Sequence, residues 1–466
     1  MKIKYIDLID QTYYFPQTEF QLNNKNQLLF HGVNMMKLVE QYGSPLKFNY
    51  LPKISENIQS AKKWFNDSMK KHNYNANYHY AYCTKSSHFK HVIEEALKND
   101  IQIETSSAYD INIIESFIKE GKISKNNYIL CNGFKREKYI SNIARLINNG
   151  HDRCIPIIDN YEEISLLEAE IEGSFNVGIR IASEEEPKFE FYTSRLGIGY
   201  QDIITFYRNE IEKKEDVNLK MLHFFINTGI RDTAYYWNEL NKCLRVYVKL
   251  KKICPTLDSL NIGGGFPIKN SLAFDFDYAY MVDEIINQIK VACDNAEVPV
   301  PHIFTEFGSF TVGESGGAIY KILYQKKQND KEKWNMINSS FITTLPDSWA
   351  INRRFLMLPI NRWSDEYERV LLGGLTCDSE DYYNSEQHVN AIYLPKYSEQ
   401  KPLYIGFFNT GAYQESIGGY GGIQHCLIPA PKHIIINKDA DGNITTKLFA
   451  PEQTSDQFLK LLGYEY

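Results

Sequence analysis

The sequence lacks the long apolar run that a membrane-spanning helix requires. No stretch approaches the roughly 18 apolar residues needed, and the opening residues 1–15 carry Asp7 and Asp10 where a signal peptide has an apolar core. An excess of positive charge is also missing, because the formal net charge is −7. A basic nucleic-acid-binding surface is therefore not expected. We expect a soluble, cytoplasmic protein that binds neither membrane nor nucleic acid.

Cysteine is sparse and shows no paired spacing. The eight cysteines are scattered along the chain, and no Cys-x-x-Cys pair occurs. Zinc ribbons and redox-active dithiols use such pairs, and secreted disulfide frameworks need denser cysteine. The pattern predicts free thiols in a reducing compartment and no metal site.

Short apolar runs alternate with helical patterns between residues 45 and 310. The runs are rich in Ile, Val, Phe and Tyr, as strands buried on both faces are. The eight predicted strands are 78–83, 101–104, 128–131, 155–159, 177–181, 221–226, 257–262 and 303–306. Helical patterns cover 54–69, 91–99, 109–119, 139–148, 161–172 and 237–253. This order predicts an α/β fold, a TIM (β/α)8 barrel, although a doubly wound open sheet alternates in the same way.

From about residue 311 short strands follow one another without long helices between them. The predicted strands are 320–325, 341–344, 355–359, 370–376, 390–394, 403–408, 433–437 and 445–449. The charged run 326–333 is predicted to be a solvated loop. The strand-like segment 20–30 has no place in the barrel. We therefore assign residues 1–44 and 311–466 to one β-rich domain.

Chemistry in a TIM barrel lies at the C-terminal ends of the strands. Gly263, Gly264 and Gly265 follow the seventh predicted strand, a common position of barrel phosphate sites. Consecutive glycines let backbone N–H groups point at an anion. The triplet therefore favours a phosphate cradle over the alternative, a flexible loop.

A lysine and a glutamate complete the pattern. Lys85 follows the first predicted strand, where a desolvated amine can act as a nucleophile; Lys135 and Lys220 compete for this role. Glu306 ends the eighth strand, where it would either keep a pyridinium nitrogen protonated or form an ordinary ion pair. An amine, a phosphate cradle and a pyridinium partner together point to pyridoxal phosphate (PLP).

Further segments carry a family resemblance. They are 42–46 (YGSPL), 80–81 (YA) with Lys85, 180–181 (RI), 194–198 (SRLGI), 262–266 (IGGGF), 305–306 (TE), 376–379 (TCDS) and 411–415 (GAYQE). Three more are 131–135 (CNGFK), 345–349 (LPDSW) and 406–408 (GFF). From residue 30 to about 436 the chain resembles the fold-type III PLP-dependent amino-acid decarboxylases. Because of the last three segments it is most similar to the biosynthetic arginine decarboxylases.

The resemblance implies a TIM barrel with a C-terminal all-β domain that decarboxylates L-arginine to agmatine and CO2 for polyamine biosynthesis. It makes Lys85 the Schiff-base lysine and Cys377 the acid that protonates Cα. The implied cofactor contacts are Lys85, Glu104, Arg180, His223, Gly263, Gly264, Gly265, Glu306 and Tyr413. The implied substrate contacts are Asp378 and, as added negative charge, Asp381 or Glu380. The family also implies a homodimer or a multiple of one, with the Cys-Asp segment donated by the partner.

Two departures from the family pattern concern the cofactor. Where relatives have a second histidine that stacks on the ring, this chain has Phe225, so either Phe225 or His223 stacks there. Where relatives place a phosphate-binding arginine, this chain has Ser309. The phosphate is then expected to depend on backbone N–H groups, Tyr413 and Thr228.

Other interpretations stay open. Ornithine, lysine or diaminopimelate are alternative substrates, although diaminopimelate enzymes typically carry Cys-Glu where this chain has Cys377 and Asp378. A non-catalytic PLP-binding homologue is a further alternative, but such proteins usually lose the lysine or the cysteine. Magnesium accompanies some relatives, yet no carboxylate cage for it is evident.

Overall fold

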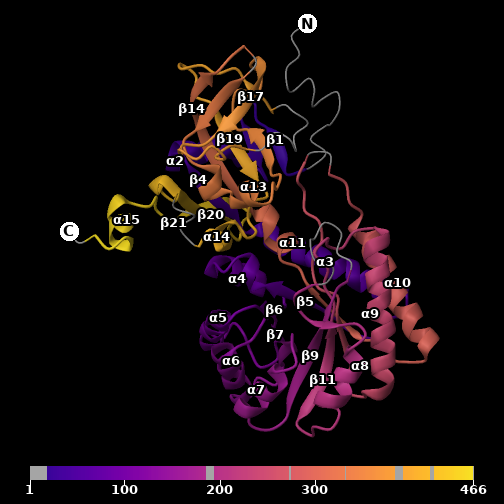
Figure 1. Ribbon diagram of the computed structural model, residues 1–466. Coiled ribbons are helices and arrows are strands. Elements are labelled where there is room, and N and C mark those ends of the chain that lie inside the picture. Colours follow the sequence, from indigo (N-terminus) through magenta and orange to yellow (C-terminus); the bar gives the residue numbers. More distant parts are fainter. Residues whose placement is uncertain are drawn as a thin grey trace. The chain divides into compact units, whose positions relative to one another are not determined.

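The computed structural model describes residues 18–184, 194–271, 274–330, 332–383, 392–419 and 425–464. Two compact units make up the chain (Figure 1). One, the barrel unit, comprises Ile54–Pro267 and Phe276–Thr311, and the other, the β unit, comprises Met1–Lys53, Ile268–Asp275 and Val312–Tyr466. Within the described residues, no helix is both long and apolar enough to cross a membrane. The expected absence of a signal peptide concerns 1–15, which lie outside the described residues.

Eight parallel strands form the barrel unit. They are β5 (Tyr78–Cys83), β6 (Gln102–Thr105), β7 (Ile129–Cys131), β8 (Cys154–Ile158), β9 (Phe175–Ala182), β11 (Val217–His223), β12 (Ser259–Asn261) and β13 (His302–Glu306). They pair in the order β9-β11-β12-β13-β5-β6-β7-β8, and β8 pairs back to β9. This closure confirms the predicted TIM barrel and excludes the open sheet. A short strand, β10 (Ile198–Gly199), pairs with β9 alongside the barrel.

Helices surround these strands (Figure 1). They are α3 (Pro52–Lys71), α4 (Lys90–Leu97), α5 (Ala108–Lys119), α6 (Glu137–Asn148), α7 (Glu163–Glu170), α8 (Ile203–Phe206), α9 (Ala234–Ile253) and α10 (Tyr278–Ala296). Side-chain oxygens of Ser107, Thr233 and Asp277 each accept a backbone N–H of the first turn of α5, α9 and α10. Such caps fix where a helix begins, because the first N–H groups have no partner inside the helix. The chain therefore enters α5, α9 and α10 from the preceding segment at defined points.

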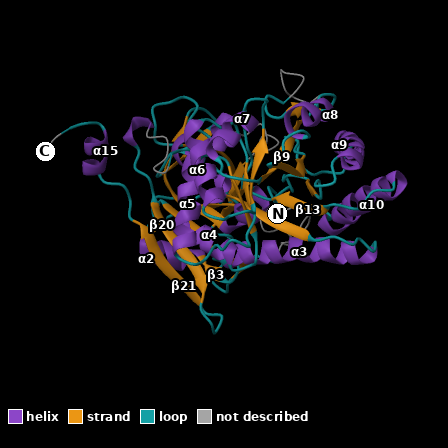
Figure 2. Cartoon of the chain, turned by 90° about the horizontal axis from the view of Figure 1, so that it is seen from below, coloured by secondary structure: helices purple, strands orange, loops and turns teal. Residues whose placement is uncertain are grey.

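The β unit contains two sheets. β1 (Phe20–Leu22), β2 (Leu28–Phe30) and β3 (Val33–Asn34) form a three-stranded sheet, followed by α2 (Met35–Tyr42). The larger, nine-stranded sheet contains β4 (Leu46–Tyr50), β14 (Gly316–Lys327), β15 (Lys333–Ile337), β16 (Leu356–Pro359), β17 (Tyr367–Gly373), β18 (Ile392–Pro395), β19 (Tyr404–Phe408), β20 (Lys432–Lys438) and β21 (Ile444–Ala450). In Figure 2, β20 and β21 lie side by side, as their antiparallel register requires.

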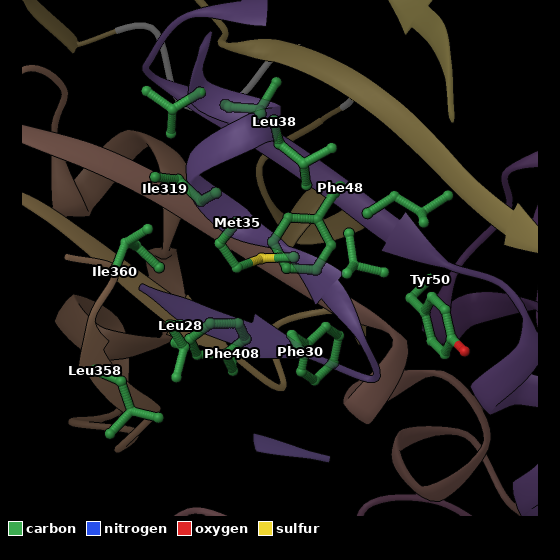
Figure 3. Packing of buried hydrophobic residues seen from close by; sticks show 14 of the residues in the cluster. Leu28, Phe30, Met35, Leu38, Phe48, Tyr50, Ile319, Leu358, Ile360 and Phe408 are labelled. Atoms are coloured by element: carbon green, nitrogen blue, oxygen red, sulfur yellow. The ribbon is translucent and has the colours of Figure 1, made fainter. Parts of the chain in front are cut away.

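One apolar cluster joins the two sheets of the β unit. Leu28 and Phe30 from the small sheet are fully buried against Phe48 of β4 and Phe408 of β19, and Met35 at the start of α2 fills the space beside them (Figure 3). Burying a side chain of this size contributes about 1.5–3 kcal/mol. This packing places segment 20–30 in the β unit, although in a sheet of its own.

Strand β4 moves the predicted domain boundary. Residues from 45 onward were predicted to begin the barrel, but β4 pairs antiparallel with β14 and parallel with β20. Its residues Phe48 and Tyr50 are buried in the cluster of the β unit. The barrel unit consequently begins at Ile54.

The strand predicted at 341–344 is wrong, since these residues form the short helix α12 (Phe341–Thr344). Ser340 caps it by accepting the N–H of Thr343, and this local hydrogen bond outweighs the β-branched composition. The predicted loop 326–333 overlaps two strand ends, because β14 runs to Lys327 and β15 begins at Lys333. The prediction at 390–394 corresponds to β18 from Ile392 on, while residues 390 and 391 lie outside the described residues.

Candidate active site

Lys85 lies at the C-terminal end of β5, in the single turn Thr84–Ser86. Its Nζ donates to both carboxylate oxygens of Glu104, at 2.8 and 2.9 Å. The side chain of Lys85 is 41% exposed and that of Glu104 is fully buried. A buried carboxylate thus holds an accessible amine at the open end of the barrel.

Asn132 links Glu104 to the second glutamate of the site. Its Nδ2 donates to Oε1 of Glu104 at 3.1 Å and to Oε1 of Glu306 at 2.9 Å. Asn261 donates to the same oxygen of Glu306 at 2.6 Å. Lys85, Glu104, Asn132 and Glu306 therefore form one hydrogen-bonded chain across the ends of the strands.

Burial dominates the electrostatics of this chain. It raises the pKa of Glu104, the Lys85 ammonium opposes the rise, and the Glu306 carboxylate adds to it. Two carboxylates in a region of low dielectric constant favour a further positive charge between them. The site is therefore suited to a cationic group beside Glu306, such as a protonated ring nitrogen.

His223, at the end of β11, faces Glu306 with Nε2 3.5 Å from Oε2. Burial, followed by the positive charges of Arg180 and Lys85, lowers the pKa of His223 well below its ordinary value, so the ring is neutral. Among the described residues neither ring nitrogen has a hydrogen-bond partner. Phe225 lies beside the glycine loop, where a Cβ on Gly263 would come 3.1 Å from its ring, and its ring centroid is 5.7 Å from the guanidinium carbon of Arg180.

The glycine triplet after β12 packs backbone against backbone. Gly263 and Gly265 have φ of +68° and +107°, which other residues rarely adopt, and a Cβ on Gly264 would lie 2.0 Å from the carbonyl oxygen of Glu306. A Cβ on Gly229 would likewise lie 2.4 Å from the carbonyl oxygen of Gly265. Only glycine therefore fits this loop.

Buried polar atoms beside these groups have no partner in the described part of the chain. They include the hydroxyl of Thr228, next to Gly229, and Nε of Arg180. Unpaired buried donors are rare in folded proteins and point to a missing ligand. A hydroxyl beside a glycine loop, a guanidinium and a carboxylate set for a protonated ring are the groups that PLP requires, so the residues fit this cofactor.

The competing lysines are engaged elsewhere. Lys135 is buried, and its Nζ donates to Glu163 at 3.1 Å and to the carbonyl oxygens of Gly133 and Ile157. Lys220 forms a partly exposed ion pair with Asp258. Lys85 is therefore the lysine that the barrel presents at the site. Ser309, where relatives have arginine, begins the short helix α11 (Ser309–Val312).

The Cys-Asp segment lies in the β unit. Cys377 is exposed, and its Sγ lies 3.3 Å from Sγ of Cys426. This contact with Cys426 raises the pKa of Cys377, which keeps the thiol protonated at neutral pH. Asp378 places Oδ2 3.5 Å from Nε2 of His425 and accepts the N–H of Glu380 on its other oxygen.

Asp381, unlike Cys377, is buried. Its Oδ1 accepts hydrogen bonds from Ser340 and from the N–H groups of Phe341 and Ile342, while Oδ2 accepts from the N–H and hydroxyl of Thr376. With 5% exposure and both oxygens occupied, Asp381 fixes the segment that carries Cys377. The prediction that it adds charge for the substrate is therefore corrected.

Tyr413 precedes helix α14 (Gln414–Ile417) in a left-handed conformation, with φ of +68°. The next residue, Gln414, donates to Oδ2 of Asp347 at 2.8 Å, and Arg353 donates to the same oxygen at 2.9 Å. The segments 345–349 and 411–415 are thus tied together within the β unit.

Sequence reasoning missed the two bridging amides. Asn132 occurs in a segment noted only for its resemblance, and Asn261 is a polar residue between Leu260 and Ile262 in an apolar run. For Asn261, an amide inside a predicted buried strand was the available signal, because such a group needs a partner. Asn132 directly follows the predicted strand 128–131 and carried no such signal.

Two groups of potential metal ligands occur among the described residues. One is Cys83, Glu104 and Glu306, whose carboxylates are held by Lys85 and the two amides; the other is Cys377, His425 and Cys426. Neither is the all-oxygen set that magnesium prefers.

Comparison with known proteins gives a family match over more than half of the chain. Residues 53–313 match the model of the pyridoxal-dependent decarboxylases, pyridoxal binding domain. The biosynthetic arginine decarboxylase of Prochlorococcus marinus (strain AS9601) is 21% identical, with 96% of this chain and 88% of that protein aligned. The protein of the same name from Geobacter sp. (strain M21) is 23% identical, over 92% of this chain and 87% of its own length.

Solved structures share the fold at low identity. The crystal structure of the biosynthetic arginine decarboxylase from Campylobacter jejuni has a TM-score of 0.80 and 18% identity, covering 98% of this chain and 90% of that one. Diaminopimelate decarboxylase from M. jannaschii, in complex with L-lysine, has a TM-score of 0.78 and 17% identity, covering 95% and 97%.

Proposed function

The chain belongs to the pyridoxal-dependent decarboxylase family, and we propose that its substrate is L-arginine, which it converts to agmatine and CO2 for polyamine biosynthesis. The observation that carries this choice is the extent of the match, because relatives named biosynthetic arginine decarboxylase align over 96% and 92% of the chain. The partly exposed carboxylate of Asp378, the residue after Cys377, supports it chemically. A guanidinium binds a carboxylate through two parallel hydrogen bonds.

The barrel unit supplies the proposed cofactor site. Lys85 would hold PLP covalently, the glycine loop and Thr228 would bind its phosphate, and Glu306 would lie at its ring nitrogen. Bound PLP supplies the electron sink that takes up the charge left when CO2 departs. The Ser309 position adds no positive charge, so the backbone N–H groups and Thr228 would carry more of the phosphate binding.

Glu306 would act on the cofactor ring through its negative charge and its fixed orientation. Hydrogen bonds from Asn132 and Asn261 fix the carboxylate, and its negative charge would keep a ring nitrogen protonated. The neutral ring of His223 next to it adds no competing positive charge. Glu104 holds the Lys85 ammonium at the mouth, where the amine can exchange with that of the substrate.

Proton return to Cα is assigned to Cys377. Its thiol is protonated at neutral pH because the contact with Cys426 raises its pKa. A group that keeps its proton until the transition state is a suitable general acid. We further propose that Cys377 and Asp378 serve the barrel site of a second copy of the chain, so that the active species is a homodimer or a multiple of one. A fully active monomer in sedimentation would contradict this.

Replacing Asn132 by alanine is expected to lower turnover about 10- to 100-fold, because small displacements of reacting groups cost this much. The change removes the amide with which Asn132 bridges Glu104 and Glu306. Steady-state turnover and the affinity for PLP are the measurements. Asn142→Ala is the matched control, since that buried amide donates to the carbonyl of Ala108 on the outer helices. Equal activity of the two variants would argue against a role for the bridge.

The substrate is tested by supplying arginine, ornithine, lysine and diaminopimelate separately to purified, PLP-loaded protein. We expect CO2 and agmatine from arginine alone. Putrescine, cadaverine or lysine would overturn arginine and retain the decarboxylase mechanism. No product from any of the four, with PLP still bound, would favour the non-catalytic homologue.

A further inference from the structure

Three side chains that bind soft cations converge at the exposed end of the Cys-Asp segment. Single ligand atoms of Cys377, His425 and Cys426 all lie within 4.8 Å of one another. The two Sγ atoms are 3.3 Å apart, and the backbone N–H of Cys377 also points at Sγ of Cys426, at 3.4 Å. All three residues belong to the β unit, so the cluster forms within one unit.

Asp378 lies next to the imidazole of His425. Its Oδ2 lies 3.5 Å from Nε2 of His425, too far for a hydrogen bond of ordinary strength. Nε2 is itself buried and has no hydrogen-bond partner among the described residues. A buried imidazole nitrogen without a partner costs free energy, and a cation bound to its lone pair would remove that cost.

The spacing of these atoms suits one tetrahedral ion. Bonds of about 2.0–2.3 Å to nitrogen, oxygen and sulfur place tetrahedral ligands about 3.3–3.8 Å apart. Two sulfur ligands at about 2.3 Å from the ion stand about 3.8 Å apart, so the Sγ–Sγ separation of 3.3 Å has to open by about 0.5 Å. Ligand atoms of all three residues already lie within 4.8 Å of one another, so small side-chain rotations admit the ion.

The donor set determines which ion fits. Two thiolates and an imidazole select zinc over magnesium or calcium, which prefer oxygen, and water is an ordinary fourth zinc ligand beside three protein ligands. The cysteines are exposed, so an ion reaches them from solvent.

We propose that Cys377, Cys426 and His425 form a binding site for Zn2+, with a water molecule as the fourth ligand. Binding releases the two thiol protons to solvent, forms two Zn–S bonds, one Zn–N bond and one Zn–O bond to water, and changes no oxidation state. Bound zinc occupies the sulfur atom that the proposed mechanism uses as an acid. Zinc is therefore expected to inhibit decarboxylation; this consequence rests on the proposed function, whereas the binding itself does not.

Cobalt is the spectroscopic probe for this site. Full-length, PLP-loaded protein is reduced, freed of metal by a chelator and titrated with Co2+. We expect one Co2+ per chain, with the thiolate charge-transfer band and the intense visible bands of tetrahedral cobalt, and we expect Zn2+ to displace it. Loss of a direct ligand in Cys426→Ser should weaken binding at least about 100-fold, since even outer-shell partners are worth 10- to 100-fold.

Two further variants test whether loss of cobalt binding is specific to the proposed ligands. His425→Gln removes a second ligand independently, and retained PLP absorption and circular dichroism show that each variant is folded. His72→Ala is the control, because that histidine pairs with Asp283 in the barrel unit. The site is overturned if Co2+ gives no thiolate band, or if Cys426→Ser and His425→Gln bind it as tightly as His72→Ala does.

Activity measurements distinguish a failure of the zinc site from a failure of the proposed function. Zinc should inhibit the unsubstituted protein, and should inhibit Cys426→Ser at least about 100-fold more weakly relative to that variant's own zinc-free rate. Tight binding without inhibition would overturn the acid role of Cys377 and leave the site standing. If zinc neither binds to the protein nor slows its decarboxylation, the zinc site is overturned and the proposed function stands.

Discussion

Lys85→Ala is expected to abolish decarboxylation and the visible absorption of the covalently bound cofactor together. Lys85 is the lysine that the barrel unit presents at its open end, held through both oxygens of Glu104. Removing the group that makes the covalent bond should lower turnover by at least about 10⁴-fold, as for other enzymes that lose their nucleophile. Absorption spectra after dialysis and single-turnover assays measure the two effects.

Lys220→Ala is the matched control for this experiment. Lys220 was a candidate for the same role on sequence grounds, but it lies three residues before the end of β11, and its ion pair with Asp258 is partly exposed. We expect this variant to keep its turnover and its spectrum. Retention of covalent PLP by Lys85→Ala would transfer the role to another lysine and remove the basis of the mechanism.

Cys377→Ala is expected to lower turnover by about 10²–10⁴-fold, the usual contribution of a positioned general acid. The thiol next to Cys426 holds a proton at neutral pH, and alanine has none to give. The KM for arginine should change far less than kcat, because an interaction made only in the transition state is removed. Steady-state kinetics over a range of arginine concentrations is the measurement.

Asp378→Asn is the comparison for Cys377→Ala, and its effects on KM and kcat are expected to be reversed. If Asp378 binds the distal cation of the substrate, its loss should raise KM more than it lowers kcat. Cys377→Ser, which keeps a hydroxyl but has little acidity, should stay close to Cys377→Ala. A serine or alanine variant with nearly full turnover would show that another group protonates Cα.

The barrel could be predicted because its strands are buried on both faces and read as nearly continuous apolar runs. The ends of these strands also placed Lys85, Glu104 and Glu306 near one another, and the structure brings the three together. The bridging amides could not be assigned in this way. A single Asn132 or Asn261 in a sequence does not show which carboxylates it will meet.

The β unit was harder to predict for physical reasons. Strand β4 is short, and its partners lie hundreds of residues away, so nothing local assigns it to either unit. Asp381 looked like one of several available carboxylates, and only its five hydrogen bonds identify it as structural. The cluster of Cys377 with Cys426 was hidden because 49 residues separate them.

The position of β4 also has a consequence for how the protein is made. This strand lies between β14 and β20, and near it Lys432 donates to the carbonyl of Tyr42 across 390 residues of sequence. A ribosome therefore releases the whole barrel before the strand that completes this edge of β4 has been synthesised. Contacts this distant in sequence form late and slowly. During synthesis the nascent chain has to keep β4 from pairing elsewhere until nearly the last residues emerge. The N-terminal segment is therefore the part of the chain at greatest risk of aggregation during synthesis.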